Sequence, residues 1–452
     1  MKKVVFLCLF IAGTFAISSC TSNLEQVETI NLDRETVFAD SAYTARFLSQ
    51  IYTNVGYDVK PNRYKTEFMG WVTQHGGLQT ACDEAAYKVV SDVTNDVMFA
   101  TGTINPVNVK EDDVWKIAYV NIRRANVFMR YVDGSPITKS VKQQYKAEAR
   151  FFRALNYFYL VKMFGDVPMM TEPTEDATLI EYPTRTAKAT IYEQIIVPDL
   201  KDAVENLPSA TFSGNSHRIT KYAADMLLAD VYMMLGEYGN AATPLRDVIN
   251  SGLFSLTANE NLGLSSAYNK LRTTDDLPEV IYAREYDGSI SNTGNLPVHA
   301  FNGDAEAFFT ASSTKNKYSL WVNVYGISNQ YLNVYENNDL RVQPNQFFQW
   351  EYTHPIDGTK ITFGTANNPV ACNWYWYDEA AILETGIGTK DWNFYRYAET
   401  LLSAAECIAQ SEGVTSEAVN YLAQVKARAN TEGKTVADIA SSLQGMGKQA
   451  LH

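Results

Sequence analysis

The chain has 452 residues, 46% of them hydrophobic, with 38 basic and 51 acidic side chains and a formal net charge of −13. A chain of this length and composition can bury a large core of its own. The acidic excess argues against a nucleic acid as partner, because binding phosphates requires a positive surface.

The N-terminus has the pattern of a bacterial lipoprotein signal. Lys2 and Lys3 precede an uncharged, mostly apolar run at 4–17, and small residues then precede Cys20. The run is too short for a transmembrane helix of about 20 residues, but it suits a signal-peptide core. We expect residues 1–19 to be removed and Cys20 to be lipidated, since two or more acyl chains give stable anchoring. The alternative is a soluble secreted protein in which Cys20 is incidental.

The mature chain offers no covalent framework. Removing residues 1–19 takes away two lysines and no acid, which leaves 36 basic and 51 acidic side chains and a net charge of −15. Beyond Cys20, the remaining cysteines are Cys82, Cys372 and Cys407. Three scattered cysteines predict neither a disulfide framework nor a zinc site.

Residues 115–164 carry the clearest helical pattern. Apolar side chains recur at intervals of three and four residues in two stripes, separated by a turn at 133–136. The stripes are Trp115, Ala118, Ile122, Ala125 and Met129, then Tyr145, Ala149, Phe152, Leu155, Tyr159 and Met163. Ser140 and Gln143 have the spacing of a capping box, and Gly165 and Pro168 should end the second helix. The pattern predicts an antiparallel helical hairpin.

Two further helical stretches follow. The first contains Ile196, Leu200, Ala203 and Leu207, and Pro198 should kink it or start a new helix because it lacks an amide donor. The second contains Ala223, Met226, Leu227 and Leu235. It leads into a turn at 235–241 like that of a tetratricopeptide repeat, in which Gly236 ends one helix and Ala241 allows the next to pack closely. Pro244 falls near the start of that next helix.

A late helical pair is expected at 397–410 and 416–430. Its small or apolar residues predict close packing: Ala398, Leu402, Ala405, Ala418, Leu422, Val425 and Ala429. Between 252 and 393 the helical period is lost, which predicts an irregular insert with a few short strands, such as 279–284, packed on the helices. The fold class is therefore mainly α, a tetratricopeptide-like helical hairpin scaffold at about 36–251 and 394–430 with a partly β insert.

The sequence YKAEARFFRALNYF at 145–158, with KMFGDVP at 162–168, closely resembles the signature of SusD/RagB-type proteins. Further matching stretches cover nearly the whole mature chain: 78–85 with Asp83-Glu84, 115–126, 279–286, 331–341 with Asp339 and Arg341, and 396–406. These proteins are surface lipoproteins of Bacteroidetes that cap a TonB-dependent outer-membrane transporter and capture glycans or, in some members, peptides.

The resemblance implies a single SusD-like domain over 20–452, a lipid-anchored position in the outer membrane facing the cell exterior, and a SusC-like TonB-dependent transporter as partner. Members of the family continue well past the helix at 416–430, whereas this chain stops at 452. We therefore expect the C-terminal part of the family fold to be missing, because the sequence is truncated or because this copy has lost its end.

No catalytic constellation is visible in the sequence. Adjacent carboxylates occur at Asp83-Glu84, Glu111-Asp112-Asp113, Asp275-Asp276 and Asp378-Glu379. Glycoside hydrolysis instead needs two carboxyl groups facing each other across the scissile bond. The five histidines are far apart, and no HExxH pair, nucleophile elbow, P-loop or dinucleotide fingerprint occurs. The sequence predicts no catalytic residue, no metal site and no cofactor, and a binding protein rather than an enzyme.

Aromatic side chains are the better indication of a site. Five of the seven tryptophans lie in or at the edge of the insert: Trp321, Trp350, Trp374, Trp376 and Trp392. A sugar has an apolar C–H face and a hydroxyl rim, so it requires an exposed ring and a few polar groups. If 374–377 is extended, both of its indoles share one face, which could serve a ligand or pack on the helices.

The candidate ligand-binding residues are therefore Trp71, Tyr87, Trp321, Trp350, Trp374 and Trp376. In SusD/RagB-type proteins, ligand-stacking aromatics occur in the early part of the chain and in the insert. The resemblance therefore implies Tyr87 and Trp321, by approximate position only. Trp115 is expected in the core, since it belongs to an apolar stripe.

Capture of a glycan nutrient is the leading hypothesis. A peptide ligand, as in RagB-like members, is the alternative within the same class. An assembly lipoprotein that binds only other proteins and a surface hydrolase are the competing classes.

We predict that Trp321→Ala or Tyr87→Ala weakens glycan binding and leaves the melting temperature nearly unchanged, because an exposed stacking ring contributes to the ligand rather than to the core. Affinity titration and thermal unfolding measure the two effects. Unaltered affinity in both variants would remove these residues from the site.

Overall fold

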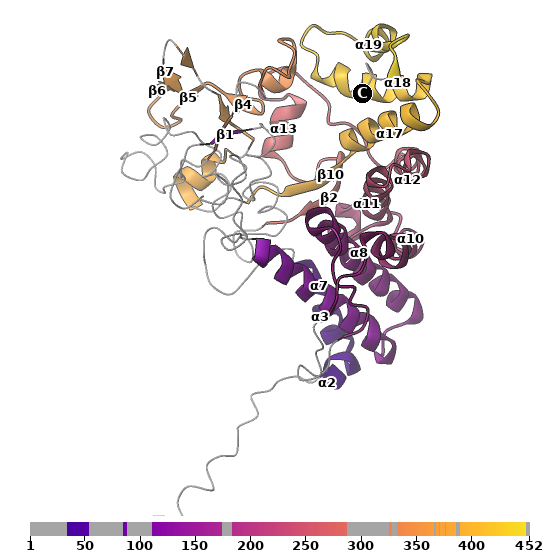
Figure 1. Cartoon of the computed structure of the whole chain (residues 1–452). Coiled ribbons are helices and arrows are strands. Elements are labelled where there is room, and N and C mark those ends of the chain that lie inside the picture. The colour runs from indigo at the N-terminus through magenta and orange to yellow at the C-terminus, as the bar shows by residue number, and fades with distance from the viewer. Residues whose placement is uncertain are drawn as a thin grey trace, which may run out of the picture.

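The computed structural model describes residues 34–53, 85–87, 111–173, 183–286, 325–327, 332–365, 368–369, 371–375, 377–385 and 389–448. Cys20, Trp71, Trp321 and Trp376 lie outside these residues. Helices stack from one end of the described chain to the other, and short strands lie to the side of the stack (Figure 1). The expectation of a mainly α fold with a partly β insert is confirmed.

The helices of the scaffold occupy both ends of the chain. Their bounds are α2 Arg34–Ala39, α3 Ser41–Thr53, α7 Glu111–Tyr131, α8 Lys139–Phe164, α9 Lys188–Ile191, α10 Val197–Asn206, α11 Lys221–Met234, α12 Tyr238–Asn250, α17 Tyr397–Ser411, α18 Ser416–Ala429 and α19 Val436–Leu443. Short 3-10 turns lie at Val132–Gly134 and Ser213–Asn215. From α7 to α8, α10, α11, α12, α17, α18 and α19, each helix packs on the next. The insert thus interrupts the sequence of the stack without interrupting the stack itself.

The hairpin of α7 and α8 forms as predicted. Ala118, Ile122 and Phe152 of the two stripes are fully buried, and Trp115 packs partly buried against the same core. The expected capping box is wrong: α8 begins one residue before Ser140, and Thr138 is its N-cap without a side-chain capping bond. The end of α8 is as expected, because Gly165 adopts a φ of 68°, which favours glycine, and donates its N–H to Val161.

Pro198 starts a new helix, as one of the two predicted alternatives. A π-helical turn at Tyr192–Ile196 precedes α10, and Pro198 lies in the first turn of α10. A widened turn accommodates a residue that cannot donate to the preceding carbonyl.

The turn between α11 and α12 also follows the prediction. Gly236 has a φ of 74° and Ala241 is fully buried. Pro244, however, lies inside α12 rather than near its start, because the helix already begins at Tyr238.

The late helical pair is confirmed at α17 and α18, with one exception. Leu402 was expected to pack between the helices but is 41% exposed. The sequence prediction also missed α19, although its Thr435 and Asp438 form a complete capping box with the spacing that signals a helix start.

The described part of the insert contains one short helix and small antiparallel strand pairs. Their bounds are α13 Ala267–Thr273, β2 Val280–Arg284, β3 Tyr325–Ile327, a 3-10 turn at Leu340–Val342, β4 Phe348–Gln349, β5 Glu351–Thr353, β6 Lys360–Thr362, β7 Gly364–Thr365, β8 Asn368–Pro369, β9 Cys372–Asn373, a π turn at Ala381–Thr385 and β10 Trp392–Arg396, with β1 Ala85–Tyr87 supplied from earlier in the chain. The pairs are β1–β3, β2–β10, β4–β9, β5–β6 and β7–β8. The expected strand at 279–284 is confirmed as β2.

The pair of β2 and β10 joins the insert to the stack. Val280, Ile281, Tyr282 and Ala283 of β2 and Tyr395 of β10 belong to the main hydrophobic core, most of which consists of helix residues from Phe38 to Leu443. No described helix is long and apolar enough to cross a membrane. The division of the chain into a signal peptide at 1–19 and a single domain at 20–452 stays a prediction.

A buried carboxylate lies where insert and stack meet. Glu279 is fully buried and accepts hydrogen bonds from Arg396 at 2.9 Å and Arg428 at 2.5 Å. It also accepts one from the backbone N–H of Thr257 at 3.0 Å. Burial raises the pKa of a carboxyl group, but here Arg428 and Arg396 outweigh it and hold the pKa of Glu279 below its usual value.

We predict that Glu279→Gln destabilises the protein at pH 7 by about 3–5 kcal/mol, because it leaves the buried Arg428 and the half-buried Arg396 without their anion. Because the folded pKa is lowered, the stabilisation is complete above the unfolded value of about 4.3 and is lost as the pH falls through the folded value. Urea unfolding at several pH values should therefore show a constant difference between variant and wild type from pH 7 to 5, and a shrinking one below about pH 4.

Glu336→Gln is the matched control, because Glu336 pairs with Lys426 at 3.3 Å on the surface. Its effect should stay within about 1 kcal/mol. A Glu279→Gln variant as stable as this control would contradict the role given to Glu279.

Candidate functional site

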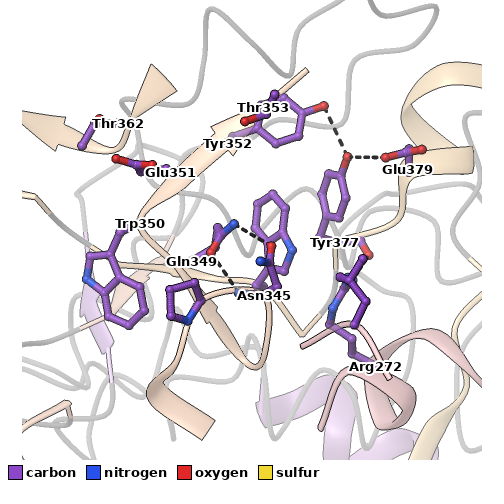
Figure 2. Close-up of a pocket in the computed structure, with 13 residues that line it drawn as sticks. Arg272, Asn345, Gln349, Trp350, Glu351, Tyr352, Thr353, Thr362, Tyr377 and Glu379 are labelled. Carbon is purple, nitrogen blue, oxygen red and sulfur yellow. Dashed lines mark hydrogen bonds between the residues drawn. The ribbon is translucent and has the colours of Figure 1, made fainter. Parts of the chain in front are cut away.

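A cavity of about 800 Å³ opens in the insert (Figure 2). Its walls are α13, the turn before β4, the hairpin of β5 and β6, and the segment that follows β9. A volume of this size falls in the range of about 300–1,000 Å³ that ligand sites occupy.

Trp350 presents a partly exposed indole to the cavity. It lies between β4, which pairs with β9, and β5, which pairs with β6. Its carbonyl accepts a hydrogen bond of 2.9 Å from the backbone N–H of Phe363, which continues the ladder of β5 and β6. The backbone of Trp350 is thus held on both sides, and its ring is available to a ligand.

Two amide side chains lie beside this indole in Figure 2. Gln349 donates to Asn345 Oδ1 at 2.9 Å, and the backbone N–H of Asn345 donates back to Gln349 Oε1 at 3.0 Å. Asn345 has a φ of 66°, a left-handed conformation that asparagine tolerates better than most residues. Its side-chain nitrogen has no hydrogen-bond partner among the described residues, so it remains available to donate into the cavity.

A stacked aromatic pair forms another part of the wall. The rings of Trp374 and Tyr377 lie 4.0 Å apart and 12° from parallel. The Tyr377 hydroxyl lies within hydrogen-bond distance of the Tyr352 hydroxyl at 3.3 Å and of Glu379 at 3.4 Å, and its one proton serves either acceptor. Burial raises the pKa of Tyr377, and the nearby Tyr352 and Glu379 raise it further, so this phenol stays protonated.

The segment 374–377 is not extended, so the condition under which its two indoles would share a face is not met. The backbone N–H of Tyr377 donates to the carbonyl of Trp374 at 3.1 Å, which closes a turn. Trp374 is only 4% exposed, so its ring packs against the ring of Tyr377 and has little contact with solvent.

Arg272 reaches the cavity from α13. The helix starts at the N-cap Ser266, whose hydroxyl accepts from the N–H of Asn269 at 3.1 Å and also contacts the buried Gln346. Asn269 in turn donates to the carbonyl of Asn345 at 2.7 Å. These bonds fix α13 against the turn before β4, and Arg272 therefore has a defined position beside Tyr377.

The structure brings some of the predicted site residues together. Trp350 and Trp374 line the cavity, whereas Trp71, Trp321 and Trp376 lie outside the described residues. Tyr87 is described through its backbone, which pairs with Tyr325 of β3. In turn, β3 lies against β9, the strand that leads into Trp374.

Sequence reasoning missed the polar residues of the cavity, namely Arg272, Asn345 and Gln349. Each comes from an irregular segment or a short helix, where no periodic pattern indicates which side chains face a cavity. Tyr377 belongs to the aromatic run at 374–377. Its stacking on Trp374 depends on a turn, which the alternation of tryptophan and tyrosine in this run does not indicate.

The carboxylates considered for catalysis have structural partners where they are described. Asp275 pairs with Lys390, Asp276 hydrogen-bonds to His217 at 3.0 Å, and Asp378 accepts from the N–H of Ala381 at 3.0 Å. Within the described ranges, no group of three His, Cys, Asp or Glu side chains could hold a metal ion.

A second hollow of about 670 Å³ lies among α17, α18 and α19. It contains the exposed Leu402 and Met446, with Lys426 and Lys434 at its edge, and no aromatic ring lines it. The aromatic walls therefore distinguish the cavity of the insert as the candidate ligand site.

Comparison with known proteins agrees with this architecture. Residues 66–233 match a SusD-like family model described as "Starch-binding associating with outer membrane", and residues 278–451 match the model of the SusD family. A SusD-like protein of Formosa agariphila is 28% identical over 329 residues, which cover 70% of this chain and 62% of that protein. This chain therefore spans less than two thirds of that relative.

Solved structures share the fold. A SusD superfamily protein of Parabacteroides distasonis superposes with a TM-score of 0.72 at 21% identity, covering 91% of this chain and 83% of that one. The surface glycan-binding protein A of Bacteroides thetaiotaomicron, solved in complex with laminarihexaose, gives a TM-score of 0.66 at 17% identity and covers 91% and 87% of the two chains. With two family models that together match most of the sequence and a shared fold along the stack and the insert, the chain belongs to the SusD/RagB family.

Proposed function

We propose that this chain binds an oligosaccharide nutrient in the cavity of the insert and performs no catalysis on it. Loops carried by a rigid scaffold commonly bind ligands. The surface glycan-binding protein A of Bacteroides thetaiotaomicron, whose fold this chain shares, holds laminarihexaose. Its ligand supports a glycan as the class of ligand here.

The observation that carries the proposal is the position of Trp350. Its partly exposed indole lines the cavity next to Asn345 and Gln349. An aromatic face covers the C–H face of a sugar ring, and amide groups bind its hydroxyl rim. A protein that only assembles with other proteins has no need of such a cavity, which favours ligand binding over the assembly alternative.

A peptide ligand is the second candidate within the same class. An extended peptide would pair its backbone with a free strand edge or place charged ends in charged pockets. Among the described residues, β4, β5 and β6 each pair along one edge only, so strand pairing does not separate the two ligands. The partly exposed indole of Trp350 beside two amide side chains favours the glycan.

We further propose that a single SusD-like domain spans residues 20–452, that acylated Cys20 anchors it in the outer membrane facing the cell exterior, and that it delivers the glycan to a SusC-like TonB-dependent transporter. The family model that matches residues 66–233 is described as associating with the outer membrane, which supports this location.

Trp350→Ala should weaken oligosaccharide binding about ten- to hundredfold, because buried aromatic anchors carry much of the energy of an interface. Trp350→Phe should retain most of the affinity, since it keeps an aromatic face. Isothermal titration calorimetry, with the tightest-binding oligosaccharide found on a glycan array, measures the effect.

Tyr43→Ala is the matched control, because Tyr43 is an exposed aromatic of α3 outside the cavity lining. Its affinity should equal that of the wild type, and all variants should melt at similar temperatures. Equal affinity of the Trp350→Ala variant and the control would rule out the cavity as the glycan site.

Cys20→Ser should abolish incorporation of a labelled fatty acid and move the protein from the membrane fraction to the soluble fraction, because acylation provides the anchor. Metabolic labelling and fractionation of the expressing bacterium test this. Cys372→Ser is the control, since Cys372 is buried in the insert, and it should keep the label. Labelling of the Cys20→Ser variant would refute the anchor.

A further inference from the structure

We infer that the oligosaccharide bound in this cavity carries a carboxylate group, as a uronate residue does, and that Arg272 binds that group. The inference rests on the proposed function and specifies its ligand class. It comes from the incomplete set of partners around one arginine.

Arg272 has more hydrogen-bond donors than partners. A guanidinium group carries five N–H donors, and Arg272 uses one of them, from Nη1 to the carbonyl of Tyr377 at 3.3 Å. Its Nε is buried and has no partner, and the residue forms no salt bridge with the described part of the chain. By contrast, the buried Arg428 has Glu279 as its anion at 2.5 Å.

The surroundings of Arg272 leave its charge poorly compensated. Burial lowers the pKa of this guanidinium, while Tyr377 and Glu379 offset the effect in part. Its carbon lies 5.9 Å from the centre of the Tyr377 ring, which provides a weak cation–π contact. A buried charge without an ion-pair partner is costly, and a ligand anion would remove much of that cost.

The position of Arg272 is fixed before any ligand arrives. Tyr377 lies on one side of it and is itself stacked on the buried Trp374. On the other side, α13 is held by Ser266 and Asn269. A preorganised guanidinium binds a carboxylate with two parallel hydrogen bonds at a small entropic cost.

The acidic side chains of the cavity lie at its edge. Glu351 and Glu379 are both exposed, so water screens their charges, and Figure 2 shows Glu351 across the cavity from Arg272. In a chain with a net charge of −13, an anionic ligand requires one local cation that is not neutralised. Among the cavity-lining residues, Arg272 is the cationic side chain.

The first test compares matched ligands on the unchanged protein. Oligosaccharides containing galacturonate, glucuronate or mannuronate are each paired with the neutral form obtained by reducing the carboxyl groups to alcohols. We expect at least one acidic member to bind, and its reduced form to bind about ten- to hundredfold more weakly, as the loss of a charged hydrogen-bonded pair implies.

The second test removes the cation. Arg272→Met should abolish the preference for the acidic member of the pair, whereas Arg272→Lys should retain part of it because the positive charge remains. Arg130→Met is the matched control, since Arg130 is an exposed arginine of α7 outside the cavity, and it should keep the full preference. If Arg272 only held the Tyr377 carbonyl in place, Arg272→Met would not change the ratio of the affinities for the acidic and the reduced oligosaccharide.

The outcomes separate this inference from the proposed function. Neutral oligosaccharides bound as tightly as acidic ones would overturn the carboxylate while glycan binding stands. Binding of acidic peptides without binding of any glycan would overturn both. Failure of every glycan, acidic or neutral, to bind would mean that the proposed function is wrong.

Discussion

The buried carboxylate of Glu279 is the contact on which the joint between insert and stack depends. One side chain binds Arg396 at the end of β10, Arg428 of α18 and the backbone of Thr257 beyond α12. These segments lie far apart in the sequence, and a carboxylate without hydrogen bonds would be too costly to bury there. Arg428 also lies over the ring of Tyr268 at 5.0 Å, so the same cluster reaches α13, the helix that carries Arg272. This ion cluster therefore helps the β2–β10 pair to position the cavity on the scaffold.

The family signature on α8 has a structural role of the same kind. Glu148 is fully buried and binds Tyr52 of α3 at 2.5 Å and Arg218 at 2.6 Å. Arg153 forms two hydrogen bonds of 2.7 and 2.8 Å with the buried Asp199 of α10. Removing one partner of such a pair leaves an uncompensated buried charge, so a substitution of either residue strongly destabilises the fold. The stretch that identifies the family thus ties helices together and lies outside the cavity lining.

The scaffold could be predicted from the sequence because its signals are local. The stripes around Ala118 and Phe152, the turn at Gly236 and the small residues of α17 and α18 follow directly from helical periodicity. The exact starts of helices are harder to predict. The N-cap of α8 is Thr138 and not the predicted capping box at Ser140, and the sequence analysis does not identify the capping box that starts α19 at Thr435. In the insert, aromatic clustering indicated Trp350 and Trp374, but Arg272 and Asn345 meet through contacts distant in sequence. No local pattern encodes such contacts or the turn at 374–377.

The side chains that line the cavity are held in place by contacts with one another. Gln349 and Asn345 bond each other, and Tyr377 is held by Trp374, Tyr352 and Glu379. Side chains already fixed in this way lose little freedom when a ligand binds, so more of the contact energy appears as affinity. The contacts that position these groups lie largely within the insert, whereas the stack contributes the platform and the ion cluster at Glu279. The lining can therefore change without disturbing the buried pairs of the stack.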